Sequence, residues 1–155
     1  MFELTVETEF AAAHAIVIRG ERESLHGHNF RVRATVASAR EGDNKRGTGR
    51  LEAACPGTRE GVDGLDEDGL LCDFHVIERA LREIIAPWHN RNLNEVEPFH
   101  RINPTAERIA EHIGLRLQAA LRESMPAGTG SRAIRVTRVA VTEAPGCEAT
   151  WIAEP

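Results

Sequence analysis

Three histidines near the start of the chain have the spacing of a metal site. His26 and His28 are separated by one glycine at the start of a segment that alternates in polarity. Side chains two residues apart on a strand point to the same face, so both imidazoles can reach one ion. His14 follows an earlier alternating segment and shares the parity of its apolar residues. A His-x-His pair alone is often incidental, but three imidazoles with an open fourth position are typical of catalytic zinc.

Two strands must position these histidines. Residues 2–10 alternate strictly between apolar and acidic or polar side chains, and residues 28–38 repeat the alternation with Phe30 and Val32 on the apolar side. Both patterns predict half-buried antiparallel strands. The turn-rich segment 18–24 links them.

The second half of the chain predicts two helices and then two strands. Asp73 is a candidate N-cap of a helix that Pro87 ends, and Asn103 is a candidate N-cap of a second helix with Pro104 in its first position. The apolar stripe of the second helix is Ile109, Ile113, Leu117 and Leu121. The two last strands are expected at 133–142 and 147–153, joined by an Ala-Pro-Gly turn.

The order strand, strand, helix, helix, strand, strand predicts an α+β fold, with a four-stranded antiparallel sheet and two helices on one face. With 155 residues the chain is expected to form a single domain over 1–155, with a long Gly- and charge-rich loop at about 39–69.

Composition excludes several classes of protein. A net charge of −5 argues against a general nucleic-acid binder. No apolar run approaches the roughly 18 residues of a transmembrane helix, so no membrane partner is expected. The three cysteines have no CxxC spacing, which argues against a disulfide framework or a thiolate zinc site. These features are typical of a reduced, cytoplasmic protein.

Six short segments, spread over nearly the whole chain, carry its most distinctive residues: FAAAH at 10–14, LHGHNF at 25–30, GLLCDF at 69–74, NLN at 92–94, NPTAE at 103–107 and VTE at 141–143. In this order they resemble the motifs of the 6-pyruvoyltetrahydropterin synthase / 6-carboxytetrahydropterin synthase family. The order of elements is also similar to that family's tunnelling fold. The resemblance implies an oligomeric barrel, expected to be a homohexamer with sites between subunits.

The resemblance implies Zn²⁺ bound by His14, His26 and His28. It also implies that Glu143 anchors the pterin, since a carboxylate can accept two N–H bonds from the 2-amino-4-oxo edge. Without the resemblance, Glu143 would read as an ordinary strand glutamate.

Thr105 and Glu107 are further candidates for the substrate pocket. Ordinary chemistry at a helix N-terminus explains both residues equally well.

The catalytic residues depart from the family pattern. The family has a cysteine four residues before the first histidine of His-Gly-His, where this chain has Arg22. It also has an Asp-His pair before its Leu-Asn, where this chain has His89 and Asn90.

Three interpretations of this departure remain. Glu21 or Glu23 could serve as the base, with His89 as acid or base near neutral pH, although both glutamates could equally be solvated loop charges. Cys55 could reach the site from the long loop and replace the missing thiol. Alternatively, the standard chemistry is absent.

The function implied is a zinc-dependent lyase acting on the side chain of 7,8-dihydroneopterin triphosphate or a related pterin. The product would be a 6-carboxy- or 6-pyruvoyl-tetrahydropterin. The alternative is a non-catalytic or altered-chemistry homologue that binds a pterin or purine, and a weaker one is a purely structural zinc protein.

Overall fold

The structure is a computed structural model, and it describes residues 2–38, 65–66, 68–124 and 134–154. Nearly all of the predicted loop at 39–69 lies outside the described residues, and so does Cys55.

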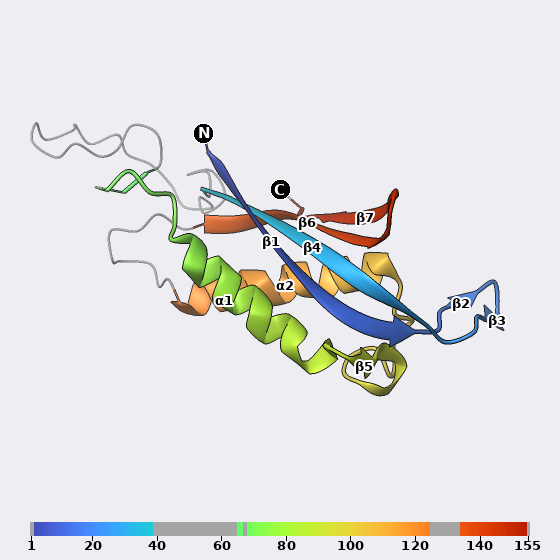
Figure 1. Cartoon of the computed structure of the whole chain (residues 1–155). Helices are drawn as coiled ribbons and strands as arrows, with labels where there is room; N and C mark the ends of the chain where they lie inside the picture. Colours follow the sequence, from blue (N-terminus) through green and yellow to red (C-terminus); the bar gives the residue numbers. More distant parts are fainter. Residues whose placement is uncertain (1, 39–64, 67, 125–133, 155) are drawn as a thin grey trace, which may run out of the picture.

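Four long strands form one antiparallel sheet, as the alternating segments predict. In chain order they are β1 (Glu3–His14), β4 (His26–Ser38), β6 (Ile134–Ala144) and β7 (Cys147–Ile152). Each pairs with the next along this series. Both helices lie on one face of the sheet (Figure 1). The α+β architecture predicted from the order of elements is therefore confirmed.

Three short strands occur where the alternating pattern gives no signal, and only one of them joins the main sheet. β5 (Arg91–Asn92) pairs in parallel with β1 at its edge, so the main sheet is mixed. β2 (Val17–Ile18) and β3 (Glu21–Arg22) form a hairpin in the predicted link and project beyond the ends of β1 and β4 (Figure 1). Strands of two residues are too short for a period of two to be recognised.

The first helix begins as predicted. α1 (Phe74–Ile85) is capped by the Asp73 carboxylate, which accepts a hydrogen bond from the His75 N–H at 2.9 Å. Pro87 lies in the short 3₁₀ turn of Ala86–Trp88 that follows the helix.

The predicted start of the second helix is wrong. α2 (Ala106–Ser124) begins after Thr105, whose Oγ1 accepts from the Arg108 N–H at 3.4 Å. Asn103 cannot serve as the cap, because both ends of its side-chain amide bond the backbone of Val17. Among the described residues no helix is both long and apolar enough to span a membrane.

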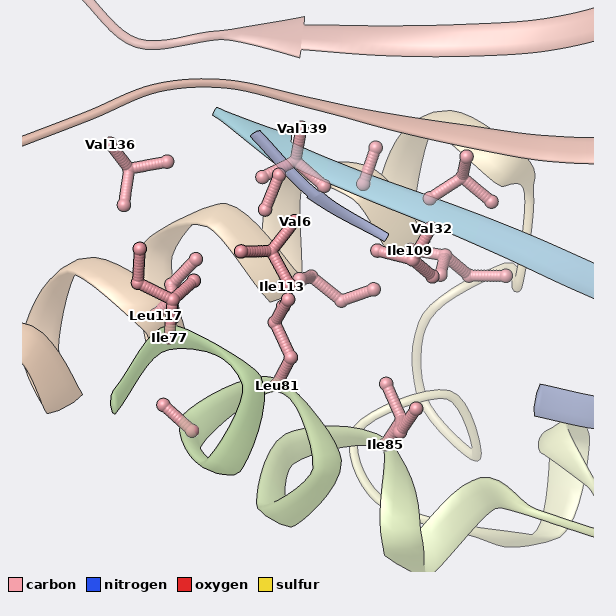
Figure 2. Packing of buried hydrophobic residues seen from close by; sticks show 14 of the residues in the cluster. Val6, Val32, Ile77, Leu81, Ile85, Ile109, Ile113, Leu117, Val136 and Val139 are labelled. Atoms are coloured by element: carbon pink, nitrogen blue, oxygen red, sulfur yellow. The ribbon is translucent and has the colours of Figure 1, made fainter. Parts of the chain in front are cut away.

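The hydrophobic core fills the space between the sheet and the two helices. Figure 2 shows side chains of α1 and α2 pointing toward those of the strands, among them Val6, Val32, Ile77, Leu81, Ile109, Ile113 and Val139. The predicted stripe of α2 is confirmed, because all four of its members are at most 1% exposed. The core therefore fixes the sheet against the helices beneath it.

Gly114 of α2 packs directly under Trp151 of β7, and a Cβ at position 114 would overlap Cε3 and Cζ3 of that ring. Alanine usually stabilises a helix relative to glycine by about 0.5–1 kcal/mol. Here we expect the opposite sign, with Gly114→Ala lowering the free energy of unfolding by about 1–3 kcal/mol through overpacking. Urea denaturation measures this change.

A double-mutant cycle tests the cause. In a Trp151→Leu background the same glycine-to-alanine change should cost much less. An equal cost in both backgrounds would show that the ring is not responsible.

Candidate metal centre

The register of β1 and β4 brings the three predicted metal ligands together. His14 lies opposite His26, and Ala12 lies opposite His28. The ring centroids of the three imidazoles are 4.9, 5.2 and 4.8 Å apart. All three side chains lie on the face that carries the core, where the His14 ring meets Phe30 edge to face. The shared parity in the sequence thus leads to one cluster.

Backbone carbonyls orient two of the imidazoles. His14 Nδ1 lies 2.8 Å from the Pro104 carbonyl oxygen, and His26 Nδ1 lies 2.8 Å from that of Ser24. Because a carbonyl can only accept, each Nδ1 carries the proton and the neutral ring keeps its lone pair on Nε2. This arrangement is typical of metal-binding histidines.

Glu143 joins the three histidines from β6. It lies between Thr142 and Ala144, where the pairing with β7 shifts register. Its Oε1 is 3.3 Å from His14 Nε2 and 3.1 Å from His28 Nε2. The ligand atoms of the three imidazoles and this carboxylate all lie within 4.8 Å of one another. These four side chains are candidate ligands of a metal ion, and we refer to them as the metal centre.

The donor set and its unsatisfied atoms fit a zinc ion. The Nε2 atoms of His14 and His28 are buried and have no hydrogen-bond partner among the described residues. Buried polar atoms normally have one, and a cation between these nitrogens would satisfy both. Imidazole nitrogens with one carboxylate oxygen are also ligands that zinc favours.

Burial favours the neutral form of His28, the partly exposed imidazole at the cleft. Removal from water lowers the pKa of His28, and the neighbouring His14 and His26 lower it further, while the Glu143 carboxylate acts in the opposite direction. The net shift is downward, so His28 is neutral near pH 7, which is the form that binds a metal.

A cleft of about 490 Å³ is lined by residues of β1, β4 and β5, and His28 is the one residue of the metal centre among them. Its lining includes His28 and, from the segment after α1, Asn90 and Arg91. Asn90 has a positive φ of 58°, a conformation that asparagine tolerates better than most residues. The volume is in the range of small-molecule sites. Asn92, which also lines the cleft, belongs to the Asn-Leu-Asn motif at 92–94 that the sequence singled out.

Two asparagines hold the chain that follows His14. The Asn94 side chain accepts from the Ala15 N–H at 2.8 Å and donates to the Ala15 carbonyl at 2.9 Å. Asn103 makes the same pair of bonds with Val17, both at 2.9 Å. Each amide therefore bonds the N–H and the carbonyl of one backbone residue, as a neighbouring strand would. Neither role was predicted, although both residues lie in the motifs that carry the family resemblance.

The predicted catalytic residues lie outside the metal centre. Glu23 is exposed, and its N–H donates to the Ile16 carbonyl at 3.0 Å, at the base of the β2–β3 hairpin. Glu21 lies further out, within β3. His89 is exposed, and its Nδ1 accepts from the Ala11 N–H of β1 at 3.4 Å.

The two further substrate candidates lie at the start of α2. Thr105 caps that helix and directly follows Pro104, whose carbonyl orients His14. Glu107 is exposed in the first turn. Neither side chain belongs to the metal centre.

Comparisons with known proteins agree with the motifs. The family model described as 6-pyruvoyl tetrahydropterin synthase matches residues 3–154. A relative from Archaeoglobus fulgidus, provisionally named a 6-carboxy-5,6,7,8-tetrahydropterin synthase, is 27% identical over 131 residues, which are 84% of this chain and 83% of the relative.

Solved structures of 6-pyruvoyl tetrahydropterin synthases share the fold. The Caenorhabditis elegans protein has a TM-score of 0.64 at 16% identity, with 99% of this chain and 98% of that chain covered. A Plasmodium vivax synthase, solved with a catalytic glutamate replaced by alanine, has a TM-score of 0.66 at 19% identity with the same coverage. The match along nearly the whole length shows that this chain belongs to the 6-pyruvoyl tetrahydropterin synthase family.

Proposed function

We propose that this protein is a zinc-dependent lyase that acts in the cytoplasm on the side chain of 7,8-dihydroneopterin triphosphate or a related pterin. The observation that supports this most is the convergence of His14, His26 and His28 beside a cleft of small-molecule size. Family membership supports a pterin as the substrate class. The product would be a 6-carboxy- or 6-pyruvoyl-tetrahydropterin.

The three imidazoles would hold the zinc, with the Pro104 and Ser24 carbonyls fixing two of the rings. Zinc held there would supply Lewis-acid chemistry, which would acidify the side-chain hydroxyls of the substrate and the C–H bonds next to them. The protein must then provide a base within reach of those protons.

Glu23 is our candidate for this base. It lies three residues before His26, and its N–H is tied to the Ile16 carbonyl, two residues after His14. Glu21 is held further from the histidines along the hairpin. The Plasmodium vivax synthase has a catalytic glutamate, so a carboxylate can be a catalytic residue in a protein of this fold. His89 is the candidate for exchanging a proton near neutral pH.

Four further residues would bind the substrate. Glu143 would accept hydrogen bonds from the 2-amino-4-oxo edge of the pterin. Arg91, which lines the cleft, would hold the triphosphate, because a guanidinium matches phosphate geometry. Thr105 and Glu107 would shape the pocket from the start of α2.

We further propose that the protein forms a homohexameric barrel. β7 lies at one end of the described sheet, and at the other end β5 covers β1 only at Ala12 and Ala13. Ile152 of β7 is 71% exposed, and unpaired strand edges are commonly covered by another copy. Light scattering would measure the mass of the assembly.

Incubation with dihydroneopterin triphosphate tests the function. We expect release of the triphosphate and a side-chain-modified tetrahydropterin on chromatography, and loss of both when the metal is removed by a chelator. Metal-replete protein that binds the pterin without converting it would instead support the altered-chemistry homologue. The replacement of the family cysteine by Arg22 and of its Asp-His pair by His89 and Asn90 favours that second candidate.

A further inference from the structure

Glu143 lies in the position of a fourth metal ligand. Its Oε1 is 3.3 Å from His14 Nε2 and 3.1 Å from His28 Nε2. Ligands at about 2.0–2.1 Å from a tetrahedral zinc are separated by about 3.3 Å, the edge of that tetrahedron. The distances from the carboxylate to the two histidines are therefore those expected for ligands that share one zinc ion.

The hydrogen bond of His14 makes a direct contact with this carboxylate unfavourable. Its Nδ1 donates to the Pro104 carbonyl, so the neutral ring presents only an acceptor at Nε2. A carboxylate oxygen is also an acceptor, and the two atoms face each other in a buried site. A cation between them turns this repulsion into coordination.

No other charge in the described part of the chain neutralises Glu143. Its close side-chain contacts there are the two neutral histidines, whereas the neighbouring Glu148 is paired with Arg33 at 3.2 Å. The irregularity between Thr142 and Ala144 sets Glu143 apart from the regular β6–β7 pairing. Bulges of this kind often re-aim a side chain beside a functional site.

We infer that Glu143 serves two ligands in turn. In the pterin-free protein its carboxylate completes the coordination of the metal with the three imidazoles. When a pterin enters, both oxygens are needed for its 2-amino-4-oxo edge, so the carboxylate leaves the metal and opens a position for the substrate side chain. The first half rests on the geometry above, and the second half rests on the proposed function.

Cobalt in place of zinc tests the coordination, because its visible spectrum depends on the number and geometry of its ligands. In pterin-free protein, Glu143→Gln is expected to change the Co²⁺ spectrum and to weaken metal binding by more than about 100-fold, because it removes a ligand rather than a residue that orients one. Glu148→Gln, the matched control on β7, should leave both unchanged. Equal spectra and affinities in the wild type and Glu143→Gln would overturn the inference.

Pterin itself, which has no side chain at C6, tests the exchange. Its addition to the Co²⁺ wild type should shift the spectrum toward that of Glu143→Gln. A pterin that binds, as seen by its fluorescence, but leaves the spectrum unchanged overturns the exchange. Failure of pterin to bind overturns the exchange and the proposed function together, while the cobalt comparison without pterin still decides the coordination. Absence of turnover with a shifted spectrum would reject only the lyase activity.

Discussion

His28→Ala is expected to release the metal and to abolish activity with it. The substitution removes one of three imidazoles that converge on a single point, and the remaining two with Glu143 form a weaker and less symmetric site. Loss of a residue that merely orients a ligand costs about 10–100-fold in metal affinity, so loss of a ligand should cost more than about 100-fold. Chelator competition and elemental analysis of the purified protein measure this loss.

His28 suits this experiment better than His14. The His14 ring is fully buried, packs against Phe30 and donates to the Pro104 carbonyl, so its removal would also disturb the fold. His28 is partly exposed and lacks such a backbone partner in the described structure. His75→Ala, an exposed histidine on α1, is the control that should keep the metal. Full metal retention in the His28 variant would defeat the ligand assignment.

The convergence of the histidines was largely predictable, because strand parity puts all three on one face and the pairing of β1 with β4 brings them together. Residues of one parity on paired antiparallel strands share a face, so His14, His26 and His28 had to meet once β1 and β4 paired in register. The helices were predictable for a similar reason, since an apolar stripe at a period of 3.6 must face the sheet.

The side-chain hydrogen bonds of the asparagines were not predictable in this way. Asn103 followed by proline has the local signature of a helix start, and local preference alone places the cap there. The structure uses its amide for Val17 instead, a contact between residues 86 positions apart. Asn94 bonds Ala15 in the same manner. Contacts of this range depend on the completed fold, so no short window of sequence reveals them.

The place of Glu143 was predictable only in part. Its parity with Val139 and Val141 puts it on the core face of β6. The irregular pairing that sets it beside His14 and His28 depends on how β6 and β7 meet around their turn. The resemblance implied a pterin anchor, and the geometry adds that the same carboxylate lies against His14 and His28.

Glu23→Gln is expected to lower kcat by about 10²–10⁴-fold, the range for loss of a general base. Glutamine keeps the size of the side chain and leaves the backbone bond to Ile16 in place, so the hairpin should be undisturbed. Metal content and KM should therefore remain close to those of the wild type. Steady-state kinetics on metal-replete protein would measure both parameters.

Glu21→Gln is the matched comparison that shows whether a loss of kcat in Glu23→Gln is specific to position 23. Glu21 is also an exposed carboxylate of the hairpin, but it is held within β3 by its pairing with Ile18, beyond the point where Glu23 is tied to the chain after His14. A few-fold change at position 21 beside a large loss at position 23 would assign the base to one carboxylate. The reverse ranking would assign it to Glu21. Unchanged kcat in both variants would remove the hairpin from the chemistry and leave His89, which contacts β1 at Ala11, as the described side chain to test next.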